Sequence, residues 1–265
     1  MDIFAKKLGE IKPEIINGFY GNGNMRPFFM TKDEVDEMNI VNNNGKFDMI
    51  CWEGNIIMQL WSNEYNWFDK SKCLIDIGAG AGEYPIFGGF EHSYAFEPNR
   101  KKQALIWANM LSSDKLDEVD VLPYAISDYP GIRAFSGWSE DIDNHPSEKP
   151  QYIEYRTLDS FNIRNVGLIK IDIEGFEYNA ICSGLATIVE NNYPPLLIEV
   201  WDEKNMNGFF PPDKLIDYKN RQQKLLILLD SLGYVKIEDP RFGDWETFFF
   251  IHKNQLNGWT KPKEQ

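Results

Sequence analysis

The sequence predicts an α/β fold in which helices cover both faces of a mostly parallel sheet. Seven short apolar runs follow one another from residue 72 onward, and helical patterns separate several of them. Such alternation is typical of strand–helix–strand units. The first run breaks into a turn with glycine at alternate positions, as a strand does when it turns sharply into a helix. The chain has 265 residues, of which 43% are apolar, so it can build one large domain with a substantial core.

Each expected strand is a short apolar run rich in branched and aromatic residues, and most are apolar enough to be buried on both faces. In chain order the seven strands are Cys73–Ile77, Ser93–Phe96, Val119–Leu122, Leu168–Ile173, Leu196–Val200, Tyr234–Ile237 and Thr247–Ile251. Apolar residues at helical spacing predict helices over Arg100–Leu111, Glu177–Glu190 and Pro212–Leu232. Asp159 is expected to cap a short helix.

Two segments depart from this alternation. Residues 1–70 are expected to form a partly helical extension, helical from Trp52 to Phe68, that packs on the α/β domain of residues 71–265. From Gly131 to Asp159 the sequence contains turn signals and then the alternating stretch Gln151–Arg156. We expect an inserted loop and an extra strand there, over the edge of the sheet where ligands bind.

Composition and charge limit the kinds of ligand and location that the protein is expected to have. The net charge of −14 argues against a protein that binds the phosphate backbone of nucleic acid. No apolar run is long enough to cross a membrane, and the N-terminus lacks the layout of a signal peptide. Three scattered cysteines and three scattered histidines predict buried thiols and no histidine-rich metal site. The sequence therefore predicts an intracellular, cytoplasmic protein.

The glycine turn indicates the kind of ligand. Gly78, Gly80 and Gly82 follow the acidic residue Asp76, with Ala79 between the first two. A dinucleotide fingerprint places its third glycine one residue later and rests a pyrophosphate on the following helix. Here that helix begins with Glu83, whose carboxylate would repel a pyrophosphate but not a cation. S-adenosylmethionine, which carries a sulfonium and an ammonium, suits the turn better.

A second acidic residue supports a ribose-containing ligand. Glu97 ends the next expected strand, 21 positions beyond Asp76, and is followed by Pro98. A carboxylate at this offset can accept hydrogen bonds from both ribose hydroxyls of NAD or of S-adenosylmethionine. The alternative is a surface strand end or a helix cap. Together with the glycine turn, the binding role is favoured.

Blocks of sequence that stand in a single order carry a resemblance to a known family. They are Leu74-Ile-Asp-Ile-Gly-Ala-Gly-Ala-Gly82, Ala95-Phe-Glu-Pro-Asn99, Pro123-Tyr-Ala-Ile-Ser-Asp128, Arg156-Thr-Leu-Asp-Ser160, Ile169-Lys-Ile-Asp-Ile-Glu-Gly-Phe-Glu177 and Pro195-Leu-Leu-Ile-Glu-Val200. Over roughly residues 45 to 205 the chain resembles the FkbM-type methyltransferases. The family often has Asn-Ile-Gly where this chain has Ala79-Gly80-Ala81-Gly82, and residues 1–45 and 131–155 match no pattern of the family.

The resemblance implies a Rossmann-like class I methyltransferase fold and an S-adenosylmethionine-dependent O-methyltransferase. The family commonly methylates hydroxyls of sugars, glycolipids or polyketides, so a sugar or glycan acceptor is expected. The implied cofactor-binding residues are Asp76, Gly78, Ala79, Gly80, Gly82, Glu97, Pro98, Asp128 and Asp172. Asp128 stands where class I enzymes recognise adenine, and a simple turn residue is the alternative.

Methyl transfer to an alcohol also requires that a proton leave a weakly acidic hydroxyl. Asp172 and Glu174 stand at the carboxyl end of the expected strand Leu168–Ile173, and Glu199 near that of Leu196–Val200, at the same edge as the glycine turn. Strand alternation would place Asp172 and Glu174 on one side, together with Lys170. The three acids are candidate catalytic bases, or with Asp202 as an alternative member they could bind Mg²⁺.

Other roles remain open for these acids. Glu174 could instead cap the next helix, and Glu177 is expected to complement that helix's positive end. His145 in the inserted loop is a further candidate base, although a surface position is favoured. For the whole chain, the alternatives are an NAD(P)-dependent oxidoreductase of Rossmann type and a non-catalytic module that keeps the fold.

Overall fold

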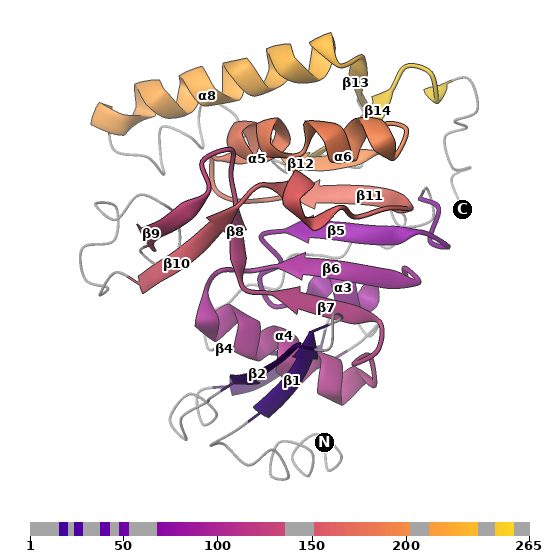
Figure 1. Ribbon diagram of the computed structural model, residues 1–265, viewed down its shortest axis with the longest axis vertical. Coiled ribbons are helices and arrows are strands. Elements are labelled where there is room, and N and C mark those ends of the chain that lie inside the picture. The colour runs from indigo at the N-terminus through magenta and orange to yellow at the C-terminus, as the bar shows by residue number, and fades with distance from the viewer. Residues whose placement is uncertain are drawn as a thin grey trace.

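The computed structural model describes residues 68–135, 151–201, 212–237 and 247–256, together with the backbone of four strands nearer the N-terminus. Its centre is a seven-stranded sheet with the strand order β13-β14-β12-β11-β5-β6-β7 (Figure 1). The strands are β5 (Cys73–Ile77), β6 (His92–Phe96), β7 (Val119–Leu122), β11 (Val166–Ile171), β12 (Leu196–Glu199), β13 (Tyr234–Ile237) and β14 (Thr247–His252). All seven coincide with predicted strands to within two residues at either end.

The sheet is mixed and mostly parallel. Strands β7, β6, β5, β11 and β12 run parallel, whereas β14 is antiparallel to both of its neighbours, β12 and β13. Because β5 and β11 are central, their residues are covered on both faces, and every residue of both strands is buried. The predicted α/β class with a largely parallel sheet is therefore confirmed.

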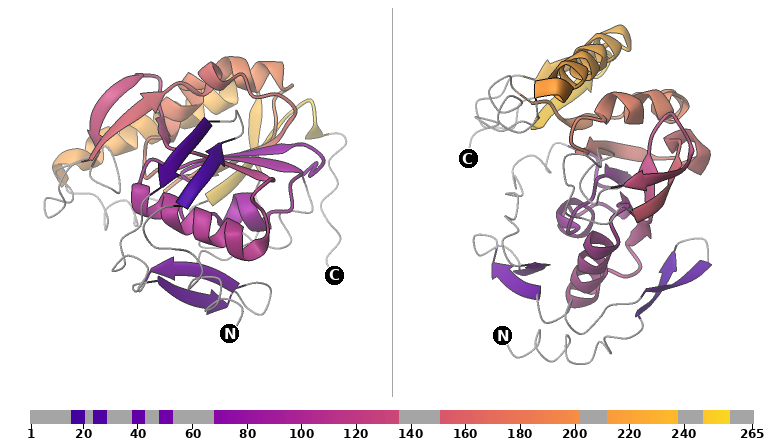
Figure 2. Two further views of the ribbon diagram at one scale, coloured as in Figure 1. Left: turned by 60° about the horizontal axis from the view of Figure 1, so that its bottom comes forward. Right: turned by 90° about the vertical axis from the view of Figure 1, so that its left-hand side faces the viewer.

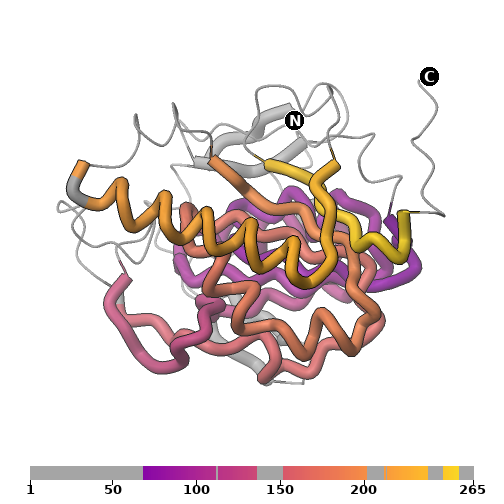
Figure 3. Tube along the Cα trace, turned by 90° about the horizontal axis from the view of Figure 1, so that it is seen from above, coloured from indigo at the N-terminus to yellow at the C-terminus, as the bar shows by residue number. Residues whose placement is uncertain are grey.

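Helices cover both faces of the sheet. One face, which includes Ile75 and Ile171, packs against α5 (Glu177–Ser183), α6 (Leu185–Glu190) and α8 (Pro212–Ser231). The other face packs against α3 (Glu83–Phe87) and α4 (Arg100–Ser113). Figure 3 shows the N-terminal half of α8 extending beyond the sheet on the side where the small sheet described below also lies. No helix among the described residues is long and apolar enough to cross a membrane.

The helix predicted over residues 177–190 is divided in two at Gly184. A Cβ atom at this position would lie 2.7 Å from Cδ2 of Leu158, which belongs to the short 3₁₀ helix η3 (Leu158–Phe161). Glycine therefore lets η3 pack directly onto the junction between α5 and α6. Helical spacing alone could not reveal this break, because the residue that requires it lies 26 positions earlier in the chain.

A second, smaller sheet stands at the carboxyl-end edge of the main sheet (Figure 1). It contains β8 (Tyr124–Ile126), β10 (Gln151–Arg156) and β9 (Gly131–Phe135) in that order. Only Pro123 separates β8 from β7, so the small sheet starts where β7 ends. The extra strand predicted at Gln151–Arg156 is confirmed, while residues 136–150, including His145, lie outside the described residues.

The described parts of the N-terminal extension are strands. β1 (Ile16–Tyr20) pairs with β2 (Asn24–Phe28), and β3 (Met38–Asn42) pairs with β4 (Asp48–Trp52), both antiparallel. β1 contacts β7 and β4 contacts α4. Figure 2 shows one hairpin on either side of α4. The helix predicted from Trp52 to Phe68 falls largely outside the described residues.

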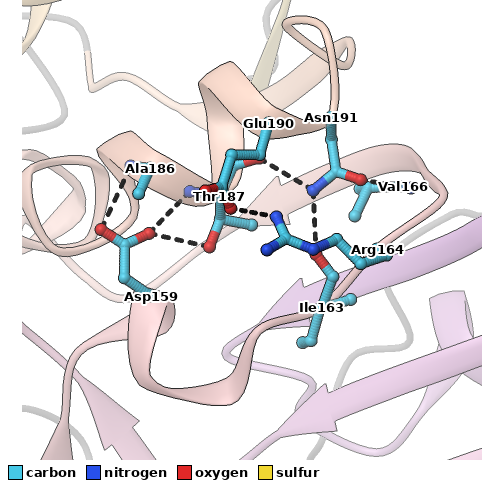
Figure 4. A network of polar contacts seen from close by, with 8 residues as sticks. All are labelled: Asp159, Ile163, Arg164, Val166, Ala186, Thr187, Glu190 and Asn191. Atoms are coloured by element: carbon cyan, nitrogen blue, oxygen red, sulfur yellow. Dashed lines mark hydrogen bonds and ion pairs between the residues drawn. The ribbon is translucent and has the colours of Figure 1, made fainter.

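Asp159 in η3 caps α6 from a distant point in the sequence (Figure 4). Its Oδ2 accepts a hydrogen bond from the Ala186 nitrogen at 3.1 Å, and its Oδ1 accepts from the nitrogen and the hydroxyl of Thr187 at 2.7 and 2.8 Å. At the other end of α6, the Asn191 amide nitrogen donates to the carbonyl oxygens of Ile163 and Thr187, at 2.9 and 2.8 Å. The predicted capping role of Asp159 is thus seen in the structure, and it fixes η3 to α6.

Replacing Asp159 by Ala is expected to lower the free energy of unfolding by about 1–2 kcal/mol, because the first turn of α6 would lose its cap. Chemical denaturation of both proteins measures this difference. Asp230→Ala serves as the matched control, since Asp230 is exposed near the end of α8. Equal midpoints for the two variants would contradict the capping role.

Candidate functional site

The glycine turn between β5 and α3 is held on two sides by its neighbours. Gly78 has φ +83°, and a Cβ atom there would lie 2.0 Å from the carbonyl oxygen of Asp172, so only glycine fits. The nitrogens of Gly78 and Ala79 donate to the Phe96 carbonyl at the end of β6, at 2.9 and 3.2 Å. At Gly80, by contrast, the nearest atom to an added Cβ is the Glu83 carboxylate at 3.8 Å. The turn is therefore rigid at its base and open at Gly80.

Glu97 lies directly against this turn. Its side chain is 3% exposed, and its Oε2 accepts a hydrogen bond from the Gly80 nitrogen at 3.0 Å while Oε1 accepts from the Asn99 nitrogen at 2.8 Å. Burial raises the pKa of Glu97, although Lys102 and these two backbone donors oppose the rise. The two predicted ligand-binding features, which are 17 residues apart, are thus in direct contact. A carboxylate oriented in this way keeps further lone pairs for the hydroxyls of a ligand.

A buried lysine connects the turn to the acidic side chains. Lys170 of β11 is 4% exposed, and its Nζ donates to the Gly78 carbonyl at 2.8 Å. The same nitrogen lies 3.2 Å from Oδ1 of Asp76 and 3.5 Å from Oδ2 of Asp172. Asp76 is fully buried, and its Oδ2 has no hydrogen-bond partner among the described residues. A group that donates a hydrogen bond or carries positive charge would complement that oxygen.

The site carries an excess of carboxyl groups. Burial raises the pKa of Asp76 to about 6 and that of Glu83 to about 7, with Lys170 opposing the rise at both. Burial would lower the pKa of Lys170, but Asp76 and Asp172 raise it above its ordinary value, so the lysine stays charged. Asp76, Glu83 and Asp172 therefore share the ammonium of Lys170, while Glu97 interacts with both Lys102 and Lys170. This balance favours a cationic ligand over a pyrophosphate.

Asp172 and Glu174 follow the end of β11, which is two residues earlier than the sequence predicts. The strand ends at Ile171, and Glu174 has φ +59°, a conformation outside any strand. The expectation that strand alternation places Lys170, Asp172 and Glu174 on one side therefore holds only as far as Asp172. The Asp172 nitrogen still donates to the Ile77 carbonyl of β5, and the chain then turns at Glu174 and Gly175, which both have positive φ.

Glu177 supports the turn that carries these acids. Its Oε1 accepts hydrogen bonds from the nitrogens of Ile173 and Gly175, at 3.1 and 3.0 Å, in the first turn of α5. On the outer side, Nε of Arg221 in α8 donates to the Gly175 carbonyl at 3.0 Å. Glu177 therefore has the predicted role at the start of the helix, and the turn is fixed from both sides.

Glu199 ends β12 beside the same turn. Burial raises its pKa well above the ordinary range, and the nearby carboxyl groups of Asp172 and Glu174 raise it further. Its Oε2 is buried without a hydrogen-bond partner among the described residues. The structure thus brings all three predicted acceptor-side carboxyl groups into one neighbourhood, from β11 and from β12.

The expected Mg²⁺ ligand set is not assembled. Within the described ranges, no group of three or more His, Cys, Asp or Glu side chains is arranged to hold a metal ion. Asp172 is engaged with Lys170 instead. The alternative member Asp202 lies outside the described residues.

Asp128 lies beside α5 rather than on the glycine turn. Its Oδ1 accepts a hydrogen bond from the Asn179 amide at 2.8 Å and from the Ser127 hydroxyl at 3.4 Å. These contacts suit a residue that ties β8 to α5. They do not test the predicted contact of Asp128 with adenine, which stays a prediction.

Sequence reasoning gave no role to Lys170 beyond its side of the strand. The signal was present, because Lys170 interrupts the apolar run of β11, and a buried ammonium needs a counter-charge. Asn109 was also missed. Its amide donates to the Ala81 carbonyl at 2.9 Å and so supports the turn from α4.

Comparisons with known proteins give a family match and several solved structures of low sequence identity. A family model described as "Methyltransferase FkbM domain" matches residues 76–249. No curated protein sequence matches the chain. Among solved structures, the methyltransferase FkbM from Methylobacillus flagellatus is 20% identical with a TM-score of 0.45, over 68% of this chain and 43% of that one, so the chain spans less than half of that protein. A putative transferase from Pyrococcus horikoshii is 13% identical with a TM-score of 0.45, over 94% of this chain and 80% of that one. An O-methyltransferase from Bacillus cereus, solved with S-adenosylhomocysteine, is 10% identical with a TM-score of 0.42, over 74% of this chain and 82% of that one.

Proposed function

The chain belongs to the FkbM methyltransferase family, an S-adenosylmethionine-dependent group, and from this premise we propose that it methylates a hydroxyl group of a sugar or glycan. One observation carries the proposal. Glu97 is hydrogen-bonded to Gly80 of the open glycine turn, beside three further carboxyl groups, those of Asp76, Glu83 and Asp172, that surround the buried Lys170. That arrangement suits a ribose attached to a cationic group.

The residues fit the cofactor in two ways. Gly80 offers open space, and Asp76 Oδ2 is buried without a partner among the described residues, so a ligand with a positive charge or a hydrogen-bond donor complements the site. Glu97 would accept hydrogen bonds from the ribose hydroxyls, and Asp76 with Glu83 would supply negative charge. Bound S-adenosylmethionine supplies an electrophilic methyl group on its sulfonium.

Proton removal from the acceptor falls to the carboxyl groups at the ends of β11 and β12. Asp172 lies 3.5 Å from the Lys170 ammonium, which would orient its carboxyl group to accept a proton from an acceptor hydroxyl. Glu199 is the second candidate, because its raised pKa makes its ionised form the stronger base. Glu174, on the same turn as Asp172, would contact the acceptor.

A sugar or glycan acceptor is the class that the family resemblance implies. The small sheet offers a surface for it, since Tyr129 and Tyr152 are 66% and 76% exposed. Flat aromatic rings with a polar tip bind carbohydrate rings through their apolar faces. The net charge of −14 supports an acceptor other than nucleic acid. The intracellular location expected from the sequence stays part of the proposal.

Transfer of a labelled methyl group tests the proposal. Purified protein is incubated with S-adenosylmethionine carrying a labelled methyl group and with separate pools of sugar nucleotides, oligosaccharides, tRNA and small phenols. We expect label in a carbohydrate pool, with Asp172→Asn as the inactive control. Label only in tRNA would contradict the acceptor class. Binding of S-adenosylhomocysteine without transfer to any pool would favour the non-catalytic module.

Treatment with a chelator distinguishes proton removal by a protein side chain from activation of the acceptor by a bound metal ion. Because no metal-holding group is found among the described residues, we expect turnover to be unchanged after EDTA treatment and dialysis. Activity measured before and after the treatment, with Mg²⁺ added back, gives the result. A loss of activity that Mg²⁺ restores would assign the carboxyl groups to a metal site instead.

A further inference from the structure

Lys170 contacts three parts of the site at once. Its Nζ donates to the Gly78 carbonyl of the glycine turn and lies 3.2 Å from Asp76 Oδ1 in β5 and 3.5 Å from Asp172 Oδ2 after β11. An ammonium has three N–H donors, and three oxygens stand around this one. The ring centre of Tyr84, at the start of α3, lies 5.3 Å from the same nitrogen.

The backbone segments next to Lys170, which are β5 with its glycine turn and the end of β11, are also in close contact with each other. Lys170 pairs with Asp76 in the parallel register of β11 and β5. One residue beyond each strand, the Gly78 Cα stands so close to the Asp172 carbonyl that a Cβ would lie 2.0 Å from it. A shift of the glycine turn would therefore move Asp172, and a shift of Asp172 would move the turn.

We propose that Lys170 is a positioning residue that sets the distance between the cofactor-binding turn and the base Asp172, without itself touching cofactor or acceptor. This role rests on the function proposed above for the same site. In an in-line methyl transfer, the acceptor oxygen must be aligned with the methyl donor, and a misplacement of about 1 Å can cost about 100-fold in rate. Lys170 donates a hydrogen bond to the turn and forms an ion pair with Asp172.

A purely structural ion pair with Asp76 is the competing explanation, and a comparison of two variants separates the two. Asp76→Asn removes the buried charge that needs Lys170 as its counter-ion, yet leaves the lysine bonded to Gly78 and Asp172. The double variant Asp76→Asn/Lys170→Met then removes the lysine without leaving Asp76 as a buried, unpaired carboxylate. Lys170→Met alone would leave that carboxylate unpaired and is expected to fold poorly, so the comparison does not use it.

We expect the two variants to melt at similar temperatures, while kcat of the double variant falls a further ~100-fold below that of Asp76→Asn. The exposed substitution Lys224→Met in α8 controls for loss of a positive charge and should keep the wild-type kcat. Equal kcat for Asp76→Asn and the double variant, in an otherwise active enzyme, would overturn the role of Lys170 alone. A wild-type protein that neither binds S-adenosylhomocysteine nor transfers methyl would overturn the proposed function, and this role with it.

Discussion

Replacing Asp172 by Asn is expected to lower kcat for methyl transfer by about 100- to 10,000-fold, the usual contribution of a positioned general base. Asparagine keeps the shape of the side chain and loses the ability to accept a proton. Asp172 lies 3.5 Å from Lys170 at the carboxyl end of β11 and next to the glycine turn, where cofactor and acceptor would meet. Single-turnover rates with saturating S-adenosylmethionine measure the loss directly.

The control for this prediction is Asp217→Asn, an exposed position in α8 that should keep the wild-type rate. Glu199→Gln provides the internal comparison, since Glu199 is the other candidate base. If Glu199→Gln loses the rate while Asp172→Asn keeps most of it, the base is Glu199 and the assignment to Asp172 is wrong.

Replacing Glu97 by Gln is expected to weaken the binding of S-adenosylhomocysteine by about 10- to 100-fold. Hydrogen bonds to a charged group contribute about 1.5–3 kcal/mol, and each 1.4 kcal/mol is tenfold in affinity. The Glu97 carboxylate accepts from Gly80 and Asn99, and the amide of Gln would retain at most one such oxygen. The substitution is therefore expected to weaken the hydrogen bonds to the ribose and to shift the glycine turn. Isothermal titration calorimetry measures the change.

Glu91→Gln is the matched control, because Glu91 is exposed just before β6 and outside the site. Thermal melting of both variants checks that the Glu97 substitution leaves the fold intact. Unchanged affinity in a folded Glu97→Gln protein would remove Glu97 from the ribose-binding site.

The sequence predicted the sheet well because its strands are local patterns. The apolar runs of β5, β6, β7 and β13 begin and end where glycine, proline or charged residues interrupt them, so their bounds are visible without the rest of the chain. The early end of β11 was not visible in this way. It follows from the positive φ of Glu174 and Gly175 and from the hydrogen bonds that Glu177 accepts in this turn, which the apolar pattern does not reveal.

The site was predicted in outline and not in its contacts. Asp76, Glu97 and the glycines were recognised from their spacing, and the structure brings them together. The reason that position 78 must be glycine, the Asp172 carbonyl, lies 94 residues further on and could not be inferred from the turn itself. The ion pair between Asp172 and Lys170 likewise depends on the pairing of β5 with β11, which the sequence does not show, and without it the carboxyl groups predict a metal site.

The central claim is that the glycine turn, Glu97 and the surrounding carboxyl groups bind S-adenosylmethionine. Calorimetric titration of the wild-type protein with S-adenosylhomocysteine and, separately, with NAD tests it most directly. We predict saturable one-site binding of S-adenosylhomocysteine and no binding of NAD. Saturable binding of NAD with no response to S-adenosylhomocysteine would contradict the claim and point to a nicotinamide-dependent oxidoreductase.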